Sequence, residues 1–252
     1  MGARARSSGR SREVESALAL VRPPSYRRRM TTLVSAVEFT ALGLQDWRVI
    51  RSGVEANFGC GSFSEAGRFA AELAKLCDER DHHASIDLRY PDLVHVMSTT
   101  HFKNALTDRD VALARSISDL AQEGGYRSTP RDSMVVEIAI DAVDIAAVLP
   151  FWQAVLGYVP EHTKEGEPVD AIIDPEGLGP NIWFQQMEAP RDERNRIHLD
   201  VNVPEDIAEE RIAAAVAAGG RLVSDAAARA FWVLADAEGN EACICTWQDR
   251  DD

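Results

Sequence analysis

Apolar and polar positions follow two different periods along the chain, and the changes of period predict its elements. In residues 62–79 apolar side chains recur every three to four positions, and Ser62 or Ser64 can cap the first turn. Residues 107–122 show the same helical period behind Thr107. The stretches SIDLRY and LVHVMST instead alternate on either side of Pro91-Asp92, which predicts a β-hairpin.

A weaker helical pattern at 33–43 and the strand-like stretches DWRVIRSG and VEANFGC come before these elements. The predicted order of this half is therefore α-β-β-α-β-β-α. Such an order implies an α+β domain with a small antiparallel sheet and its helices on one face. We place this domain at residues 31–123 and a linker at 124–133, where glycine, proline and polar residues interrupt both periods.

The second half contains a weak internal duplication. MVVEIAIDAVDIAAVLPFWQAVLGY runs strand, helix, glycine, and RIHLDVNVPEDIAEERIAAAVAAGG repeats that order about sixty residues later. Strand-like pieces follow each copy. Two βαβββ modules within one domain, residues 134–250, are the simplest interpretation. The tryptophans of this half and Phe184 are expected in its core rather than stacked on a ligand.

Charge is distributed unevenly. The net charge is −14, yet residues 1–29 carry eight arginines against two glutamates, so 19 basic and 39 acidic side chains remain in the rest. An acidic body disfavours nucleic-acid binding, and no apolar run is long enough for a membrane helix. We expect residues 1–30 to be a disordered basic extension. The four cysteines show no paired spacing, which favours reduced thiols in a cytoplasmic protein.

Three histidines, His82, His83 and His101, surround the predicted hairpin. Three imidazoles can bind a catalytic zinc ion, although this spacing matches no known zinc signature. Alternatively, the adjacent pair can stabilise a helix C-terminus, where cationic side chains are favoured. They can also converge as general acids and bases, because histidine titrates near neutral pH. Spacing alone leaves these three alternatives open.

The segment from SFSEAGRFAAELAKLCDERDHHAS to STTHFKNALTDRD resembles the pterin-4a-carbinolamine dehydratases. In that family a helix ends in an acidic residue followed by His-His, and a strand leads to Ser/Thr-Thr-His and then to Leu-Thr/Ser-x-x-Asp. The counterparts here are Asp78, His82-His83, Tyr90, Thr99-Thr100-His101, and Leu106-Thr107 with Asp110. The upstream LGLQDWRV fits as well, and the resemblance covers residues 32–122.

This resemblance implies dehydration of 4a-hydroxytetrahydropterin to quinonoid dihydropterin, without a metal cofactor. The catalytic residues it implies are His82, His83, His101 and Asp110. The substrate-binding residues it implies are Asp78, Ala84, Thr99, Thr100 and Phe102. His82 and His101 would handle the departing hydroxyl and the N5 proton in an order left open, while Asp110 or Asp78 would orient a ring. The implied partner is a small pterin, and relatives commonly form homo-oligomers.

The family usually has proline after His-His and tryptophan shortly after, where this chain has Ala84 and Ile86. The pocket wall is therefore expected to differ there. A non-catalytic pterin-binding or dimerisation protein is the rival hypothesis, because the family is known for a second role as a partner of a transcription factor.

The pieces FWQAVLGY, IHLDVNV and VLADAEGNEACI resemble the vicinal-oxygen-chelate, or glyoxalase-like, superfamily over about 134–248. Its four metal-ligand positions fall on Glu137, approximately Trp183, His198 and Cys243. Glu137 and His198 are the candidate ligands for a divalent metal. Tryptophan cannot bind a metal, and a thiolate is softer than the expected carboxylate. A metal-free binding or structural domain is therefore favoured over a metal-dependent enzyme.

Overall fold

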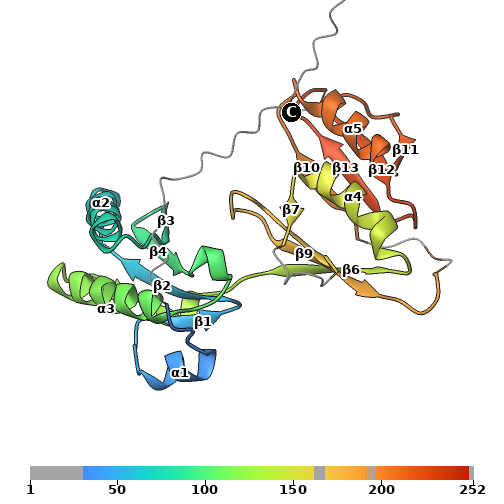
Figure 1. The fold of residues 1–252 in the computed structure, drawn as a ribbon. Coiled ribbons are helices and arrows are strands. Elements are labelled where there is room, and N and C mark those ends of the chain that lie inside the picture. The colour runs from blue at the N-terminus through green and yellow to red at the C-terminus, as the bar shows by residue number, and fades with distance from the viewer. Residues whose placement is uncertain (1–30, 162–167, 192, 194–196, 250–252) are drawn as a thin grey trace, which may run out of the picture.

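The structure is a computed structural model that describes residues 31–161, 168–191, 193 and 197–249. The basic extension expected at 1–30 lies outside the described residues. The elements form two groups joined through strand β6 (Figure 1). Within the described ranges, no helix combines the length and the apolar character that crossing a membrane requires.

The N-terminal group has the expected order of helices and strands, which confirms that prediction. Its elements are α1 (Ala36–Ala41), β1 (Arg48–Ile50), β2 (Gly53–Gly59), α2 (Phe63–Arg80), β3 (Ser85–Arg89), β4 (Leu93–Ser98), the 3-10 helix η1 (His101–Lys103) and α3 (Asp108–Glu123). The strands form an antiparallel sheet in the order β1-β2-β4-β3. The predicted hairpin corresponds to β3 and β4.

Alternation along β2 and β4 separates the two faces of this sheet. Val54, Ala56 and Phe58 of β2 are fully buried in one core with Phe69 of α2 and Ile117 of α3. Both long helices therefore cover the same face, as expected from their apolar stripes. Ser62 caps α2 and Thr107 caps α3, each by accepting a backbone N–H in the first turn.

Part of the predicted linker belongs to the sheet. Residues Arg127–Ser128 form β5 and pair with β2, and the 3-10 helix η2 (Pro130–Asp132) follows. The Asn57 side-chain amide then donates a hydrogen bond to Ser133 at 3.0 Å. These contacts hold the connecting segment on the first domain up to the start of the second.

The C-terminal group consists of the two predicted βαβββ modules. The first contains β6 (Glu137–Ala142), α4 (Ile145–Leu156), β7 (Val159–Pro160), β8 (Ala171–Ile173) and β9 (Asn181–Gln186). The second contains β10 (Leu199–Asn202), α5 (Ala208–Ala217), β11 (Arg221–Ser224), β12 (Phe231–Ala235) and β13 (Glu241–Cys245). Their sheets have equivalent orders, β6-β9-β8-β7 and β10-β13-β12-β11, so the duplication is confirmed.

Helices α4 and α5 pack together and join both modules into one core. Trp152 is buried there and donates from Nε1 to Asp236 at 3.0 Å. The expectation that all tryptophans belong to the core was wrong for Trp183 and Trp247, which are 39% and 69% exposed. Trp183 lies between the buried Ile182 and Phe184, so strand alternation turns it to the opposite face.

Candidate active site

Asp110 is the centre of a buried hydrogen-bond network at the start of α3. Its side chain is fully buried and accepts hydrogen bonds through both carboxylate oxygens. The donors, with distances to an Asp110 oxygen, are His82 Nε2 at 2.8 Å, Ser98 Oγ at 2.7 Å, Thr100 Oγ1 at 2.6 Å and the Thr107 backbone N–H at 2.8 Å. Asp110 also completes the capping box of α3 with Thr107.

These donors determine the charge of the Asp110 carboxyl group. Burial on its own raises the pKa of Asp110, because it disfavours a charge. The hydrogen bonds from His82, Thr100 and Ser98 and the Thr107 backbone outweigh burial and lower this pKa from 3.8 to about 2. Asp110 is therefore an ionised carboxylate at neutral pH.

His82 follows the C-terminus of α2, where Asp81 adopts a left-handed conformation with φ of 50°. This turn directs the His82 ring inward, and the residue is only 4% exposed. A carboxylate can only accept a hydrogen bond, so His82 Nε2 must carry the proton that faces Asp110. The second ring nitrogen, Nδ1, is then the one that carries the lone pair of the neutral ring.

The neighbouring His83 takes the opposite direction. Its Nε2 lies 3.0 Å from Asp78 Oδ1, and both side chains are largely exposed. Asp78 and His83 thus form a surface pair at the end of α2, while His82 alone joins the buried network.

His101 begins η1 directly after Thr100 and is exposed. The loop that carries it is tied down on both sides, because the Thr100 hydroxyl binds Asp110 and the Thr100 N–H donates to Ala105 O at 3.1 Å. Asp110 therefore holds His82 directly and the His101 loop through Thr100. Two of the predicted catalytic histidines are connected through one carboxylate.

Of the remaining predicted binding residues, Thr99 and Phe102 lie in this loop and Ala84 lies against the core. Thr99 is 8% exposed and donates from Oγ1 to Ser52 O at 3.0 Å, whereas Phe102 is half exposed. Ala84 is partly buried and packs against the helix-covered core, as does Ile86. The two positions at which the chain departs from the family pattern thus contact the core.

Two residues around this site, Ser98 and Arg109, were not predicted from the sequence. Ser98 donates to Asp110, and Arg109 hydrogen-bonds the Asp81 carbonyl at the C-terminus of α2. Ser98 was detectable as the last inward position of β4, but nothing in the sequence marked Arg109. A fourth histidine of the same segment, His95, lies between Glu55 (3.4 Å) and Asp87 (3.0 Å), away from Asp110.

The candidate metal ligands of the C-terminal domain are arranged differently from the expectation. Glu137 pairs with Arg51 at 2.9 Å. His198 instead groups with Asp200 and Cys243, and one ligand atom from each lies within 4.8 Å of the others. Asp200 and Cys243 are register partners on the parallel strands β10 and β13. Trp183, the second position of the family pattern, pairs with Ala139 and Ala171 in the sheet.

The donor set His198, Asp200 and Cys243 suits a borderline cation such as Zn²⁺, which accepts nitrogen, oxygen and sulfur ligands. Burial, followed by the Asp200 hydrogen bond, raises the pKa of the Cys243 thiol to about 12. A metal bound here must displace that proton, because the thiolate is the ligand.

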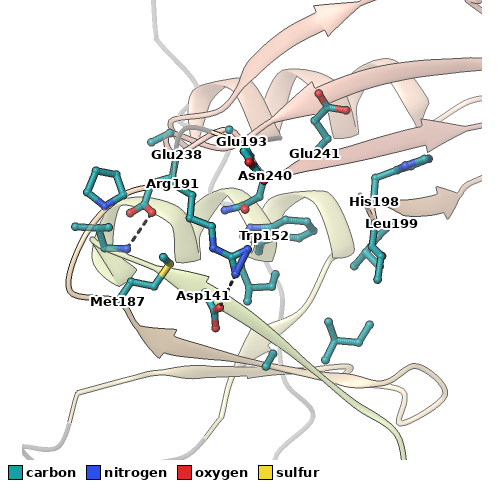
Figure 2. Close-up of a pocket in the computed structure, with 18 residues that line it drawn as sticks. Asp141, Trp152, Met187, Arg191, Glu193, His198, Leu199, Glu238, Asn240 and Glu241 are labelled. Atoms are coloured by element: carbon teal, nitrogen blue, oxygen red, sulfur yellow. Dashed lines mark hydrogen bonds and ion pairs between the residues drawn. The ribbon is translucent and has the colours of Figure 1, made fainter. Parts of the chain in front are cut away.

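A cavity of about 1020 Å³ lies between the two modules and includes His198 in its wall (Figure 2). Asp141, Glu193, Glu238 and Glu241 line it together with Arg191. Arg191 lies 3.5 Å from Asp141. Glu238 accepts hydrogen bonds from the backbone N–H groups of residues 143 and 144 at the start of α4. Most of the lining is apolar, and its charged side chains are mainly acidic.

Comparison with known proteins identifies two regions. The family model described as pterin 4 alpha carbinolamine dehydratase matches residues 32–120, and the one described as glyoxalase-like domain matches residues 137–245. Three relatives bear the name "Putative pterin-4-alpha-carbinolamine dehydratase". The protein from Thermomicrobium roseum is 43% identical over 24% of this chain, which spans 63% of that relative. The Chloroflexus aurantiacus protein is 33% identical over 30% of this chain and 80% of its own length. The Nocardia farcinica protein is 32% identical over 37% of this chain and its full length.

Two solved structures are also similar to parts of the chain. A transcriptional coactivator/pterin dehydratase from Brucella melitensis is 26% identical, with a TM-score of 0.33, and covers 36% of this chain and 99% of its own. A glyoxalase-related enzyme from Fulvimarina pelagi is 19% identical, with a TM-score of 0.35, and covers 45% of this chain and 88% of its own. The chain belongs to the pterin-4a-carbinolamine dehydratase family through its N-terminal part, and a glyoxalase-like domain follows that part.

Proposed function

We propose that the N-terminal domain, residues 31–123, dehydrates 4a-hydroxytetrahydropterin by histidine acid–base catalysis. The observation that carries this proposal is the buried Asp110 carboxylate, which binds His82 and, through Thr100, the loop of His101. A carboxylate in that position fixes the ring orientation and the tautomer of the histidine. Membership in the dehydratase family supplies the substrate class.

The reaction breaks the C4a–O bond and forms a C4a=N5 double bond. One group must protonate the departing hydroxyl, which leaves as water, while another removes the proton from N5. The proton count balances, because one proton is given and one is taken. No external acid, base or redox partner is required.

Asp110 favours His82 as the proton acceptor. With Nε2–H donated to the carboxylate, Nδ1 carries the lone pair that can remove the N5 proton, and the resulting imidazolium faces a negative charge. His101, exposed at the start of η1, is then the proton donor to the 4a-hydroxyl. His83 and Asp78 lie at the exposed end of α2, where they can bind the pterin.

The test is the rate at which purified protein accelerates the loss of 4a-hydroxytetrahydropterin. We expect His82→Ala and His101→Ala each to lose most of that acceleration, by about 100-fold or more, and to keep a folded core. His95→Gln is the control, because His95 lies in the hairpin between these two histidines and pairs with Glu55 and Asp87 instead of Asp110. Equal rates for the wild type and His101→Ala would refute the catalytic proposal. Saturable pterin binding without turnover would support the rival binding function.

A second candidate function is metal binding by the C-terminal domain, favoured by the cluster of His198, Asp200 and Cys243, of which His198 lines the cavity. A divalent ion held there would supply Lewis-acid polarisation of a ligand in the cavity. The test is metal analysis and thermal shift of the full chain with added Zn²⁺, comparing the wild type with Cys243→Ser and the neighbouring Cys245→Ser. A Zn²⁺-dependent shift lost only in Cys243→Ser supports the site, whereas no bound metal and no shift would rule it out.

A further inference from the structure

The turn between β1 and β2 lies where the N-terminal sheet approaches the first strand of the glyoxalase-like domain (Figure 1). The turn contains Arg51 and Ser52. Arg51 is one of four residues other than glycine with a left-handed backbone in the described part of the chain, at φ of 52°. This conformation is unfavourable for a side chain with a Cβ atom, so contacts on both sides must hold the turn in place.

Toward the C-terminal domain, the Arg51 guanidinium binds two carboxylates. Its Nε lies 2.9 Å from Glu137 Oε1, and its Nη2 lies 3.1 Å from Glu161 Oε1. Glu137 is the first residue of β6, and Glu161 directly follows β7. The three side chains are 31%, 36% and 23% exposed, so solvent screens the pairs only in part.

Toward the N-terminal domain, Ser52 contacts the His101 loop on both sides of the histidine. Thr99 Oγ1 donates to Ser52 O at 3.0 Å, and Ser52 Oγ donates to Asn104 Oδ1 at 3.3 Å. Asn104 is itself left-handed and ends η1, with its N–H bonded to His101 O at 3.2 Å. One turn therefore binds the second domain through Arg51 and the His101 loop through Ser52.

We propose that Arg51 is a positioning residue through which the glyoxalase-like domain holds the His101 loop in its productive place. The inference rests on the proposed dehydratase function, and it makes turnover in the first domain depend on contacts from the second. Glu137 also connects the turn to the cavity between the two modules. Ala139 and Asp141, which lie on the same strand as Glu137, line that cavity. A ligand that displaces β6 would therefore change the contact at Arg51.

The first experiment is a mutant cycle in the full chain. Arg51→Met removes the cation, Glu137→Gln with Glu161→Gln removes both anions, and the triple variant removes all three charges. We expect kcat to fall about three- to tenfold in Arg51→Met and in the paired glutamine variant, with KM changed less, and to fall no further in the triple variant. Arg51→Lys keeps one charge and should retain an intermediate kcat. Lys75→Met, a charge removal on the exposed face of α2, should leave kcat unchanged.

A second measurement needs no activity. Hydrogen exchange of the amides of Thr100 and Asn104, without substrate, should become faster in Arg51→Met and stay at the wild-type rate in Lys75→Met. Unchanged exchange in Arg51→Met would overturn the proposal, and so would additive losses of kcat in the triple variant. A wild type without dehydratase activity would refute the proposed function, while the exchange rates would still decide whether Arg51 holds the loop.

Discussion

Two carboxylates, Asp110 and Asp200, show how differently the two domains present similar chemistry. Asp110 is fully buried, and hydrogen bonds from four other residues hold its two oxygens. Asp200 is 58% exposed and lies on the edge strand β10, close to His198, which is 46% exposed. A buried, saturated carboxylate fixes the positions of its partners before any substrate binds. An exposed one is held less firmly, because water competes for its hydrogen bonds. The N-terminal site is therefore preorganised, and the C-terminal cluster is not.

The largest expected effect comes from Asp110→Asn. An amide cannot accept all the hydrogen bonds that the carboxylate accepts, and its NH2 group cannot replace the oxygen that holds His82. We expect the dehydration rate to fall at least about 100-fold and the free energy of unfolding of this domain to fall by about 3 kcal/mol. The measurements are the dehydration assay and urea unfolding. A variant with wild-type rate and stability would remove the distinction between the two domains.

Acid should destabilise the first domain through the same group. The folded pKa of Asp110 is lowered to about 2 from an unfolded value of 3.8. Its stabilising contribution is therefore present above pH 4 and is lost as the pH falls through 2. The difference corresponds to about 2 kcal/mol. Urea titrations at pH 4 and pH 2, monitored by amide exchange in β2 and β4, measure the loss of the free energy of unfolding between the two pH values. The same titrations of Asp110→Asn give the comparison. An equal loss of this free energy in the wild type and in Asp110→Asn would contradict the role of Asp110 in acid destabilisation.

The corresponding change in the second domain, Asp200→Asn, should have little effect on stability. Its side chain is mostly in water, so we expect the free energy of unfolding to change by less than about 0.5 kcal/mol. Any Zn²⁺-dependent thermal shift should nevertheless disappear. A loss of stability comparable to that of Asp110→Asn, measured by urea unfolding, would show that the exposed cluster is a structural network as well.

Chelation should have the smallest effect on the dehydratase. The network of His82, Asp110 and Thr100 is held by protein hydrogen bonds, and the candidate metal donors lie in the other domain. After dialysis against EDTA we expect an unchanged dehydration rate. A rate that falls and is restored by Zn²⁺ would mean that the first domain also depends on a metal.

Sequence patterns predicted the element order of both domains, because each long element keeps one period over its full length. They also grouped His82, His101 and Asp110, but only through resemblance to a family. Periodicity could not show that His82 turns inward and His83 outward, since the left-handed Asp81 sets that direction. Nor could it find the contact between Arg51 and Glu137, because the two residues are far apart in sequence and the domains are joined by a segment without regular pattern.

The most direct test of the central claim is the rate of 4a-hydroxytetrahydropterin loss with wild-type protein, His101→Ala and the His95→Gln control, measured side by side. We expect acceleration by the wild type and by His95→Gln, and at least about a 100-fold smaller acceleration by His101→Ala with its fold retained. Equal rates for the wild type and His101→Ala, or no acceleration by the wild type, would contradict it.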